Sequence, residues 1–295
     1  MASTTIPVDL LNPGQVFACL GLAEAADILL GEAQGGFDWS DGRGARFVLA
    51  AVGEANPVAA VLGFLDGAEV HSLCARGSQH STANWQVDTR TAQGDLYPFP
   101  ETLSPATLPC VLRGTGVSGH GKVELTIDHW GDDTCRDNLK FWAGAGGYPG
   151  VALARDALHL VRGGANQSVG DPFAVRAAQS SSFRFDWRRD YVPLDVGFSP
   201  NEHRGMTMIG FPYVELLAAV GLRDARPCRI HKLAYRYGIL GGVAATGLYP
   251  LPLLRAALGA SPLPFPRRLF RMTLGWPGQE NQARCINHVI EEAVL

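Results

Sequence analysis

Apolar residues return every three or four positions in several stretches of the chain, which is the spacing of an amphipathic helix. The first stretch follows the turn sequence Asn12-Pro13-Gly14 and continues to Gly31. Asn12 stands where a helix cap is expected, and Pro13 suits the first helical position because its missing N–H is not needed there. The same spacing predicts further helices at residues 56–65, 149–161, 212–220 and 251–258.

Other stretches alternate between apolar and polar residues, which indicates half-buried strands. Val123–Asp128 and Phe183–Trp187 show this alternation most clearly. Because helices and strands are mingled without a regular β-α-β repeat, we expect an α+β fold. It would contain mixed antiparallel sheets and several packed helices, and it would be neither a Rossmann nor a P-loop fold. Shorter strands are expected at residues 37–39, 46–50 and 230–237, with a closing strand at 272–274.

The chain has 295 residues, which allows one large domain or two modest ones. Residues 76–109 are polar and rich in Pro, Ser and Thr, as a connection between two lobes would be. We therefore predict an acidic N-terminal part, 1–110, and a basic C-terminal part, 111–295. One domain containing both parts is the alternative.

Charge is distributed unevenly along the chain. Residues 1–100 carry 4 basic and 11 acidic residues, residues 101–182 carry 7 and 8, and residues 183–295 carry 14 and 9. The formal net charge of -3 excludes a uniformly basic nucleic-acid coat, so a polyanion is expected to bind the last third. Of the 25 basic residues 22 are Arg, whose planar guanidinium suits phosphate and guanine.

The cysteine pattern and the N-terminus favour a cytoplasmic protein with reduced thiols. The 6 cysteines form no Cys-x-x-Cys pair, so neither a structural zinc site nor a secreted disulfide framework is expected. The first residues lack the basic start and apolar run of a signal peptide. The longest uncharged stretch, 238–254, is interrupted by glycines and prolines, so no membrane partner is expected.

The glycine-rich stretch Arg113–Lys122 matches the spacing of two phosphate-binding motifs. Both motifs place backbone amides around phosphate at the start of a helix. Here Lys122 precedes Val123, where a Walker A motif needs Ser or Thr, and a strand pattern follows instead of a helix. We therefore expect residues 114–121 to form a hairpin tip, which could approach a nucleic-acid backbone closely because glycine has no side chain.

An acidic cluster provides the one pattern that would fit an enzyme. Asp128, His129, Asp132 and Asp133 could help to hold a hard cation in a metal-dependent nuclease, although further ligands would have to converge from elsewhere. No serine stands in a Gly-x-Ser-x-Gly nucleophile elbow. We predict a non-enzymatic protein without metal or cofactor, and the nuclease remains the alternative.

Two segments combine aromatic and basic residues in the way that single-strand binders do. Residues 183–191 interleave Arg with Phe, Trp and Tyr, and residues 138–144 place an amide and a cation beside two aromatics. In the alternative interpretation the aromatics are core residues and Arg188 pairs with Asp186 or Asp190. The predicted nucleic-acid contacts are Asn12, Gln15, Lys140, Trp142, Arg184, Arg188, Arg189, Arg267, Arg268 and Arg271.

Asn12 and Gln15 are included because their amides could read an adenine edge, while capping the first helix is the other role expected of Asn12. The remaining basic residues of the last third would form one stripe on a helix and would scatter on strands. They are Arg223, Arg226, Arg229, Lys232 and Arg236.

Several phrases of the sequence resemble one CRISPR-associated family, which accompanies the type I-G (formerly I-U) effector genes. The first is Ile6-Pro-Val-Asp-Leu-Leu-Asn-Pro-Gly-Gln and its continuation to Ala25. The last is Phe270-Arg-Met-Thr-Leu-Gly-Trp-Pro-Gly-Gln. The other phrases lie between these two, so the resemblance covers essentially the whole chain. They occupy residues 128–130, 139–144, 183–191 and 194–202.

The resemblance implies a large-subunit-type component of a crRNA-guided Cascade complex, with no catalytic motif of its own. Such a subunit helps to recognise the motif that flanks the target, to bind target DNA and to recruit the helicase-nuclease. Its partners would be crRNA, target DNA, the backbone and crRNA-processing subunits, and the helicase-nuclease. Two alternatives remain: an RRM-like backbone subunit, and a structural subunit that contacts other proteins through the apolar residues 238–258.

Overall fold

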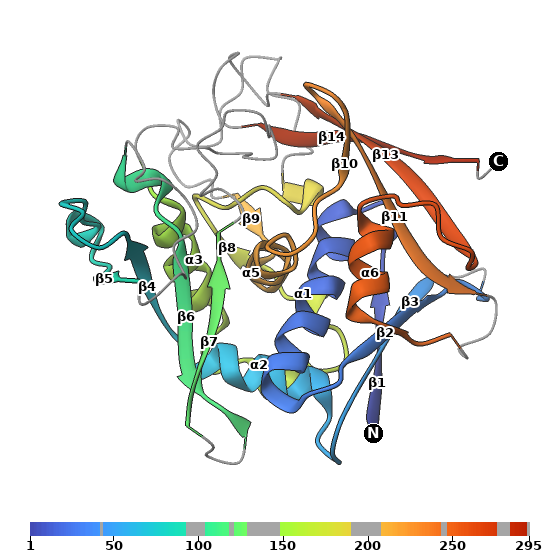
Figure 1. Ribbon diagram of the computed structural model, residues 1–295, viewed down its shortest axis with the longest axis horizontal. Coiled ribbons are helices and arrows are strands. Elements are labelled where there is room, and N and C mark those ends of the chain that lie inside the picture. The colour runs from blue at the N-terminus through green and yellow to red at the C-terminus, as the bar shows by residue number, and fades with distance from the viewer. Residues whose placement is uncertain are drawn as a thin grey trace.

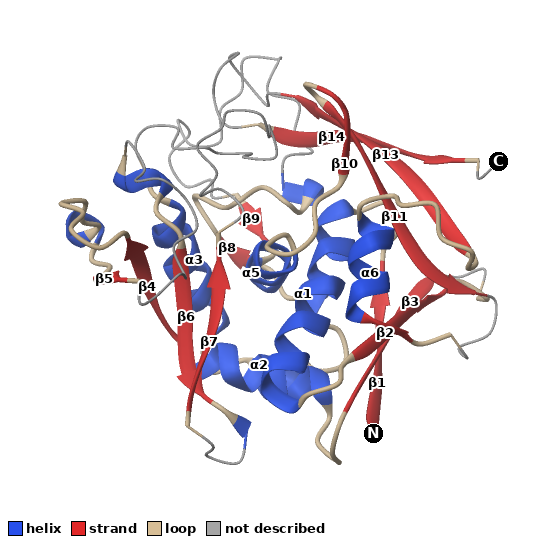
Figure 2. Cartoon of the chain, in the orientation of Figure 1, coloured by secondary structure: helices blue, strands red, loops and turns tan. Residues whose placement is uncertain are grey.

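Two β-sheets enclose a group of helices in the computed structural model of the chain (Figures 1 and 2). The structure describes residues 1–41, 44–92, 104–117, 121–128, 148–189, 208–242, 247–275 and 284–293. Helices and strands are mixed, and most neighbouring strands run antiparallel. The expected α+β class is confirmed, and the fold is neither a Rossmann nor a P-loop fold.

The larger sheet has eight strands among the described residues, in the order β1-β3-β2-β11-β13-β14, with β10 beside β11 and β12 beside β2. Its neighbours pair antiparallel except β2 and β11, which run parallel where Gly241 and Gly242 face Phe37 and Asp38. The strands are β1 (Ala2–Val8), β2 (Gln34–Asp38), β3 (Ala45–Ala51), β10 (Cys228–His231), β11 (Ala234–Gly242), β12 (Tyr249–Pro250), β13 (Arg267–Gly275) and β14 (Cys285–Glu292).

The smaller sheet has the order β5-β4-β6-β7, and β6 and β7 form an antiparallel hairpin. At its tip the amide of Gly116 donates a hydrogen bond to the carbonyl of Gly121. The hairpin expected in the glycine-rich stretch is confirmed: in the described residues the stretch leads into the strand β7, whereas a phosphate-binding motif leads into an α-helix. The strands are β4 (Glu69–Cys74), β5 (Thr89–Thr91), β6 (Cys110–Thr115) and β7 (Lys122–Ile127), and a separate short pair is β8 (Ala177–Ala178) with β9 (Ile209–Gly210).

The five expected helices are confirmed, and the longest of them lies at the centre of the fold. This helix, α1, is long and apolar enough to cross a membrane, but 78% of it is buried inside the protein, as in a core helix. It packs against α2, α5 and α6 and reaches both sheets (Figure 1). The helices are α1 (Pro13–Leu30), α2 (Pro57–Gly67), α3 (Gly150–Val161), α4 (Ala165–Ser168), α5 (Pro212–Gly221) and α6 (Leu251–Leu258).

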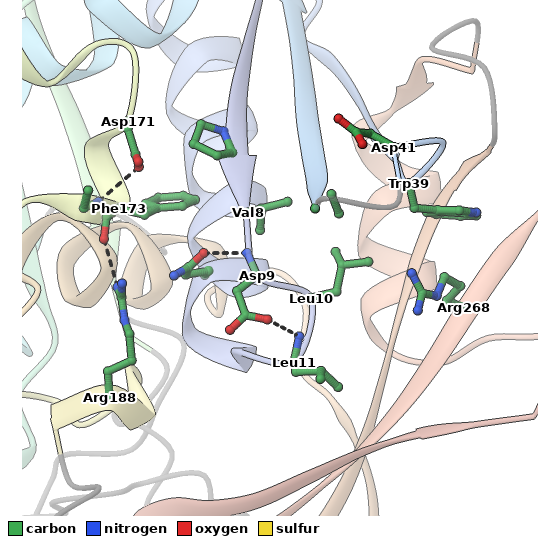
Figure 3. A pocket seen from close by; sticks show the side chains of 15 residues that line it. Val8, Asp9, Leu10, Leu11, Trp39, Asp41, Asp171, Phe173, Arg188 and Arg268 are labelled. Carbon is green, nitrogen blue, oxygen red and sulfur yellow. Dashed lines mark hydrogen bonds between the residues drawn. The ribbon is translucent and has the colours of Figure 1, made fainter.

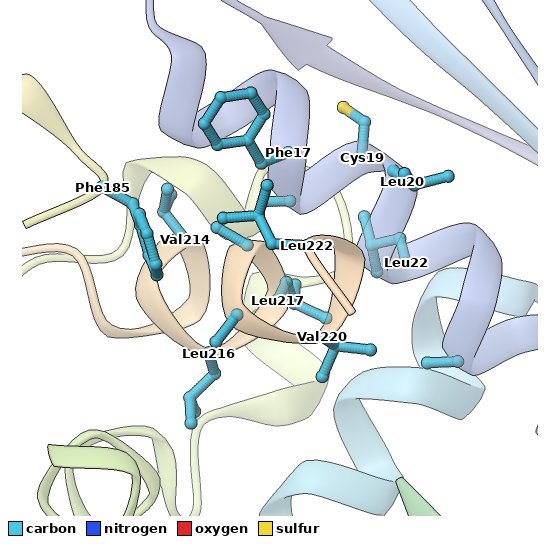
Figure 4. Packing of buried hydrophobic residues seen from close by; sticks show 14 of the residues in the cluster. Phe17, Cys19, Leu20, Leu22, Phe185, Val214, Leu216, Leu217, Val220 and Leu222 are labelled. Carbon is cyan, nitrogen blue, oxygen red and sulfur yellow. The ribbon is translucent and has the colours of Figure 1, made fainter. Parts of the chain in front are cut away.

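Two glycines allow the backbones of α1 and α5 to touch. A Cβ atom on Gly21 would lie 1.8 Å from the carbonyl oxygen of Leu217, and one on Gly221 would lie 2.3 Å from that of Phe17. Figure 4 shows the apolar side chains that fill the space around this crossing. A side chain at either glycine would force the two helices apart.

Three strand predictions were wrong or incomplete. Phe183–Trp187 is not a strand, because Arg184 has a positive φ of 64° and turns the chain. Its alternation arises because Phe183 and Phe185 both enter the core, where their rings stack. The predicted strand 230–237 is two strands, β10 and β11. The predicted closing strand 272–274 lies in the second half of β13, and β14 closes the fold.

Two edge strands, β1 and β14, had no prediction at all. β1 begins before the first clear apolar pattern, and only its last residues, Ile6 and Val8, are buried. In β14 the buried residues, Cys285 and Ile286, stand next to each other, and a bulge directly after them shifts the register. The burial of β1 alternates, but the first residues that face the core are small or polar, so the sequence shows no strand pattern there.

The core joins the two predicted parts of the chain. The larger sheet pairs β2 from the first part with β11 from the second, and the smaller sheet pairs β4 with β6 across residue 110. One cluster of buried apolar residues includes members from both parts. The apolar stretch 238–258, expected in one alternative to contact other proteins, contributes β11 and α6 to this core in its described residues.

We predict that Gly21→Ala lowers the free energy of unfolding by about 2 kcal/mol or more, because the added methyl overpacks the crossing of α1 and α5. The matched control is Gly63→Ala in α2, where a Cβ would meet no atom within 4 Å. There we expect a gain of about 0.5–1 kcal/mol from helix propensity. Urea unfolding of both variants measures the difference, and an equal effect of the two substitutions would contradict the close crossing.

Candidate functional site

The segment Phe183–Arg189 is anchored on the first turn of α1 by a buried carboxylate. The Asn12 Nδ2 atom donates a hydrogen bond of 3.0 Å to the Asp186 Oδ1 atom, and both residues are fully buried. The expected side-chain cap is absent: the Asn12 side chain holds Asp186 and makes no capping bond to the helix. Asp186 instead places its negative charge at the positive end of the α1 dipole.

Two arginines of this segment, both predicted to bind nucleic acid, are bound by other groups of the protein: Arg188 is partly exposed and Arg189 is buried. Arg188 donates from Nε and Nη2 to the Asp186 carboxylate at 2.9 and 2.6 Å, and its guanidinium lies 3.5 Å from the ring centre of Phe211. Arg189 is 4% exposed and donates to the carbonyl of Ser180 at 2.8 Å. The alternative interpretation, in which Arg188 pairs with Asp186, is confirmed.

A second buried carboxyl group supports the same segment from α5. Glu215 is fully buried, and its side chain accepts hydrogen bonds from the amides of Phe185 and Asp186 at 3.3 and 3.1 Å. Burial, with the nearby charge of Asp186, raises the pKa of Glu215 to about 8. The group is therefore mostly protonated at neutral pH.

A pocket of about 660 Å³, here called the α1 pocket, lies beside the start of α1 (Figure 3). The turn after β1, the end of β2 and the 3-10 helix Pro172–Ala174 supply most of its wall. Three predicted residues line it: Gln15, Arg188 and Arg268. Gln15 is nearly buried, and its Oε1 atom accepts a bond of 2.8 Å from the Asp9 amide, which fixes the turn that forms the pocket wall.

Arg268 enters the α1 pocket from β13 and is paired there with an acid. Its Nε and Nη2 atoms donate to the two oxygens of the Glu291 carboxylate, which belongs to β14. The same guanidinium lies 5.7 Å from the ring centre of Trp39, a pocket residue that the sequence did not single out. The positive charge of Arg268 is thus largely compensated before any ligand arrives.

Arg267 and Arg271 lie on the opposite side of β13, which we call the outer sheet face together with Arg236 and Glu292. Along β13 the side chains of Phe270 and Met272 enter the core, so Arg271 between them points away from it. Arg236 of β11 stands beside Arg271 in the register and pairs with Glu292, whose pKa its hydrogen bond lowers. Arg271 Nε is 3.8 Å from the same carboxylate.

The outer sheet face therefore carries three guanidiniums and one carboxylate. Arg271 keeps 49% of its side chain exposed, and Arg236 keeps 39%. Arg267 donates to the carbonyl of Ser261 and makes no ion pair within the described residues. The face has a net positive charge and can accept a further anion.

The remaining predicted residues do not join these groups. Arg184 lies at the turn of its segment with intermediate exposure. Lys140 and Trp142 fall outside the described residues, as do His129, Asp132 and Asp133 of the acidic cluster. The later basic residues are scattered over the end of α5, β10 and β11 rather than forming one stripe.

Asp128 is the one member of the acidic cluster that the structure describes. It follows β7, and burial raises its pKa despite the opposing charges of Arg223 and Arg226. Among the described residues, no three His, Cys, Asp or Glu side chains are grouped so that they could hold a metal ion.

Sequence reasoning named Asp186 as a partner of Arg188 but missed the acidic partners of Arg268 and Arg271. Glu291 and Glu292 form an adjacent pair near the end of the chain, and only the pairing of β13 with β14 places them beside Arg268 and Arg271. Glu215 offered a signal, because it is a lone acid on an otherwise apolar helix. Trp39 offered none, since a single aromatic after a strand is typical of core packing.

We predict that Arg188→Ala destabilises the protein by about 3 kcal/mol, because it leaves the buried Asp186 carboxylate without its cation. Arg176→Ala is the control, since Arg176 is exposed and pairs with no acid in the described part of the chain. Thermal and urea unfolding measure both. If the two substitutions cost the same, the buried ion pair does not anchor the segment.

We predict that the stability of the wild-type protein falls between about pH 5 and pH 8 relative to Glu215→Gln. The folded state raises the pKa of Glu215 to about 8 from 4.5, so it binds a proton that the unfolded state has already released. The stabilisation is complete below the unfolded pKa and is lost as the pH rises through the folded one. The slope should approach about 1.4 kcal/mol per pH unit. Urea unfolding across this range measures it, and parallel profiles of the two proteins would contradict the buried neutral acid.

Comparison of the chain with protein-family models, with curated proteins and with solved structures found no match. The function is therefore inferred from the sequence phrases and from the geometry of the chain itself.

Proposed function

We propose that the chain is a non-catalytic subunit of a crRNA-guided type I CRISPR effector complex of the I-G type. In this proposal it acts in the cytoplasm, helps to recognise the motif that flanks the target, binds target DNA and takes part in recruiting the helicase-nuclease. Its other partners are crRNA and the remaining Cascade subunits. Guide pairing reads the target sequence in such complexes, so the subunit needs to contact backbone and shape.

The observation that carries the proposal is the convergence of three of the family-like phrases at the start of α1. The phrase 6–25 contains Asn12, which binds Asp186 of the phrase 183–191. The ring of Phe17 from the first phrase contacts Tyr237, which in turn stacks on Phe270 of the last phrase. Segments far apart in the sequence thus form one structural unit, which supports a resemblance of the whole chain rather than of isolated motifs.

The outer sheet face is the part of the described surface best suited to a phosphate backbone. Arg236, Arg267 and Arg271 outnumber the single acid Glu292, and Arg271 is half exposed. Arg188 and Arg189, in contrast, are already bound by Asp186 and by the Ser180 carbonyl. Replacing them would destabilise the segment, so it would not be a clean test of a nucleic-acid contact. We therefore place the backbone contact on Arg267 and Arg271.

An RRM-like subunit of the same complex is the second candidate, and the topology of the first elements favours it. β1, α1, β2 and β3 form a split β-α-β unit in which β3 pairs between β1 and β2. RRM domains bind RNA through aromatic residues on the sheet face away from the helices. Here Thr5, Arg46 and Val48 occupy that face of β1 and β3, so base stacking there is not supported.

We predict that Arg267→Ala combined with Arg271→Ala weakens binding of single-stranded RNA and DNA. Losing two phosphate contacts should flatten the dependence of log affinity on log salt by about 1.4. Fluorescence anisotropy with labelled oligonucleotides at several salt concentrations measures both effects.

The control for this test removes the same charge from other surfaces. Arg76→Ala combined with Arg176→Ala alters two exposed arginines that take part in no ion pair within the described residues. This variant should keep the affinity and the salt slope of the wild-type protein. If both double variants bind equally well, the outer sheet face is not the contact surface.

A further inference from the structure

The α1 pocket has apolar walls and an acidic lining. Leu10, Leu11, Phe173 and Trp39 supply apolar surface around a cavity of about 660 Å³. Figure 3 shows Asp9 between Asp171 on one side and the Trp39–Asp41 turn on the other. Long aliphatic stems with a charged end pack well against a surface of this kind.

The two arginines that line the α1 pocket do not make it basic. Arg188 is bound to the buried Asp186, and Arg268 is bound to Glu291. Each cation is therefore balanced by a carboxylate that lies outside the pocket lining. The charge that a ligand would meet is set by the remaining side chains.

Two of the remaining lining side chains, Asp9 and Asp171, are acids. Asp9 accepts a hydrogen bond from the Leu11 amide at 2.9 Å, and Asp171 accepts one from the Ala174 amide at 3.1 Å. Both residues are exposed, and neither forms an ion pair in the described ranges of the chain. Backbone amides leave each carboxylate with further acceptor capacity and with its negative charge uncompensated.

The aromatic wall adds a second attraction for a cation. Trp39 already has the guanidinium of Arg268 near its ring, at 5.7 Å from the ring centre. An indole face attracts a guanidinium more strongly than it attracts a neutral group. A phosphate or a phosphorylated nucleotide would instead be repelled by Asp9 and Asp171.

We propose that the α1 pocket docks an arginine-bearing segment of a partner protein. The guanidinium binds the Asp9 and Asp171 carboxylates, and the aliphatic stem and neighbouring apolar residues pack on Leu10, Phe173 and Trp39. Arginine fits better than lysine because its planar fork can donate to carboxylates and stack on an aromatic ring at once. This surface is separate from the outer sheet face, so the inference does not depend on the proposed nucleic-acid contact.

The test uses a fluorescein-labelled peptide in which arginine and leucine alternate, with fluorescence anisotropy as the readout. A matched peptide with citrulline in place of arginine keeps the length and planarity of the side chain, removes the charge and replaces one donor nitrogen by a carbonyl oxygen. We expect the wild-type protein to bind the arginine peptide in a salt-sensitive way and to bind the citrulline peptide at least about tenfold more weakly.

The protein variants retain the backbone contacts of the pocket. Asp9→Asn and Asp171→Asn, singly and together, keep an oxygen that accepts the amide of Leu11 or Ala174 and lose only the charge. The double variant should bind the arginine peptide about tenfold more weakly than the wild type. Asp66→Asn is the control, because Asp66 accepts the Gly163 amide in another part of the protein and should leave affinity unchanged.

Two results would overturn the proposal. They are equal binding of the arginine and citrulline peptides, and unchanged affinity in the double variant with an unchanged unfolding temperature. Arg267→Ala with Arg271→Ala should leave peptide binding intact, which separates this result from the test of the outer sheet face.

Discussion

The contact between the backbones of α1 and α5 is the constraint on which the rest of the structure depends. Gly21 and Gly221 bring the two helices so close that any side chain at either position would strike a carbonyl oxygen. α1 also contacts β3 of the larger sheet and β7 of the smaller sheet, and α5 contacts β7 and α3. Moving the helices apart would therefore shift both sheets. It would also move Glu215 away from the amides of Phe185 and Asp186 that it holds.

Carboxylates of the protein determine which arginines keep a positive charge that is available to another molecule. Asp186, Glu291 and Glu292 each hold a guanidinium, but they differ in burial and in what they leave exposed. Asp186 is fully buried and binds Arg188, and this ion pair fixes the segment that borders the α1 pocket. Glu292 serves Arg236 and only weakly Arg271, so the outer sheet face stays basic. Arginine–carboxylate pairs thus occur at both surfaces, yet the α1 pocket is acidic and the outer sheet face is basic.

The sequence predicted the α+β class, the helices and the glycine-rich hairpin, because these depend on local periodicity and turn chemistry. It misread residues 183–187, where two core aromatics imitate a strand although Arg184 turns the chain. The candidate site was harder, because Arg268 and Arg271 looked available until the pairing of β13 with β14 placed Glu291 and Glu292 beside them. Gln15, Arg188 and Arg268 do meet at one pocket, yet its acidic character follows from Asp9 and Asp171, which no pattern singled out.

Reconstitution of the complete effector particle tests the central claim most directly. The chain would be co-purified with the neighbouring effector proteins and a crRNA, and capture of target DNA would be measured with and without it. Our account predicts that the chain joins the particle and that DNA capture falls sharply when it is left out. A chain that stays outside the particle and cleaves nucleic acid in the presence of Mg²⁺ or Mn²⁺ would contradict the account and return the function to the acidic cluster that begins at Asp128.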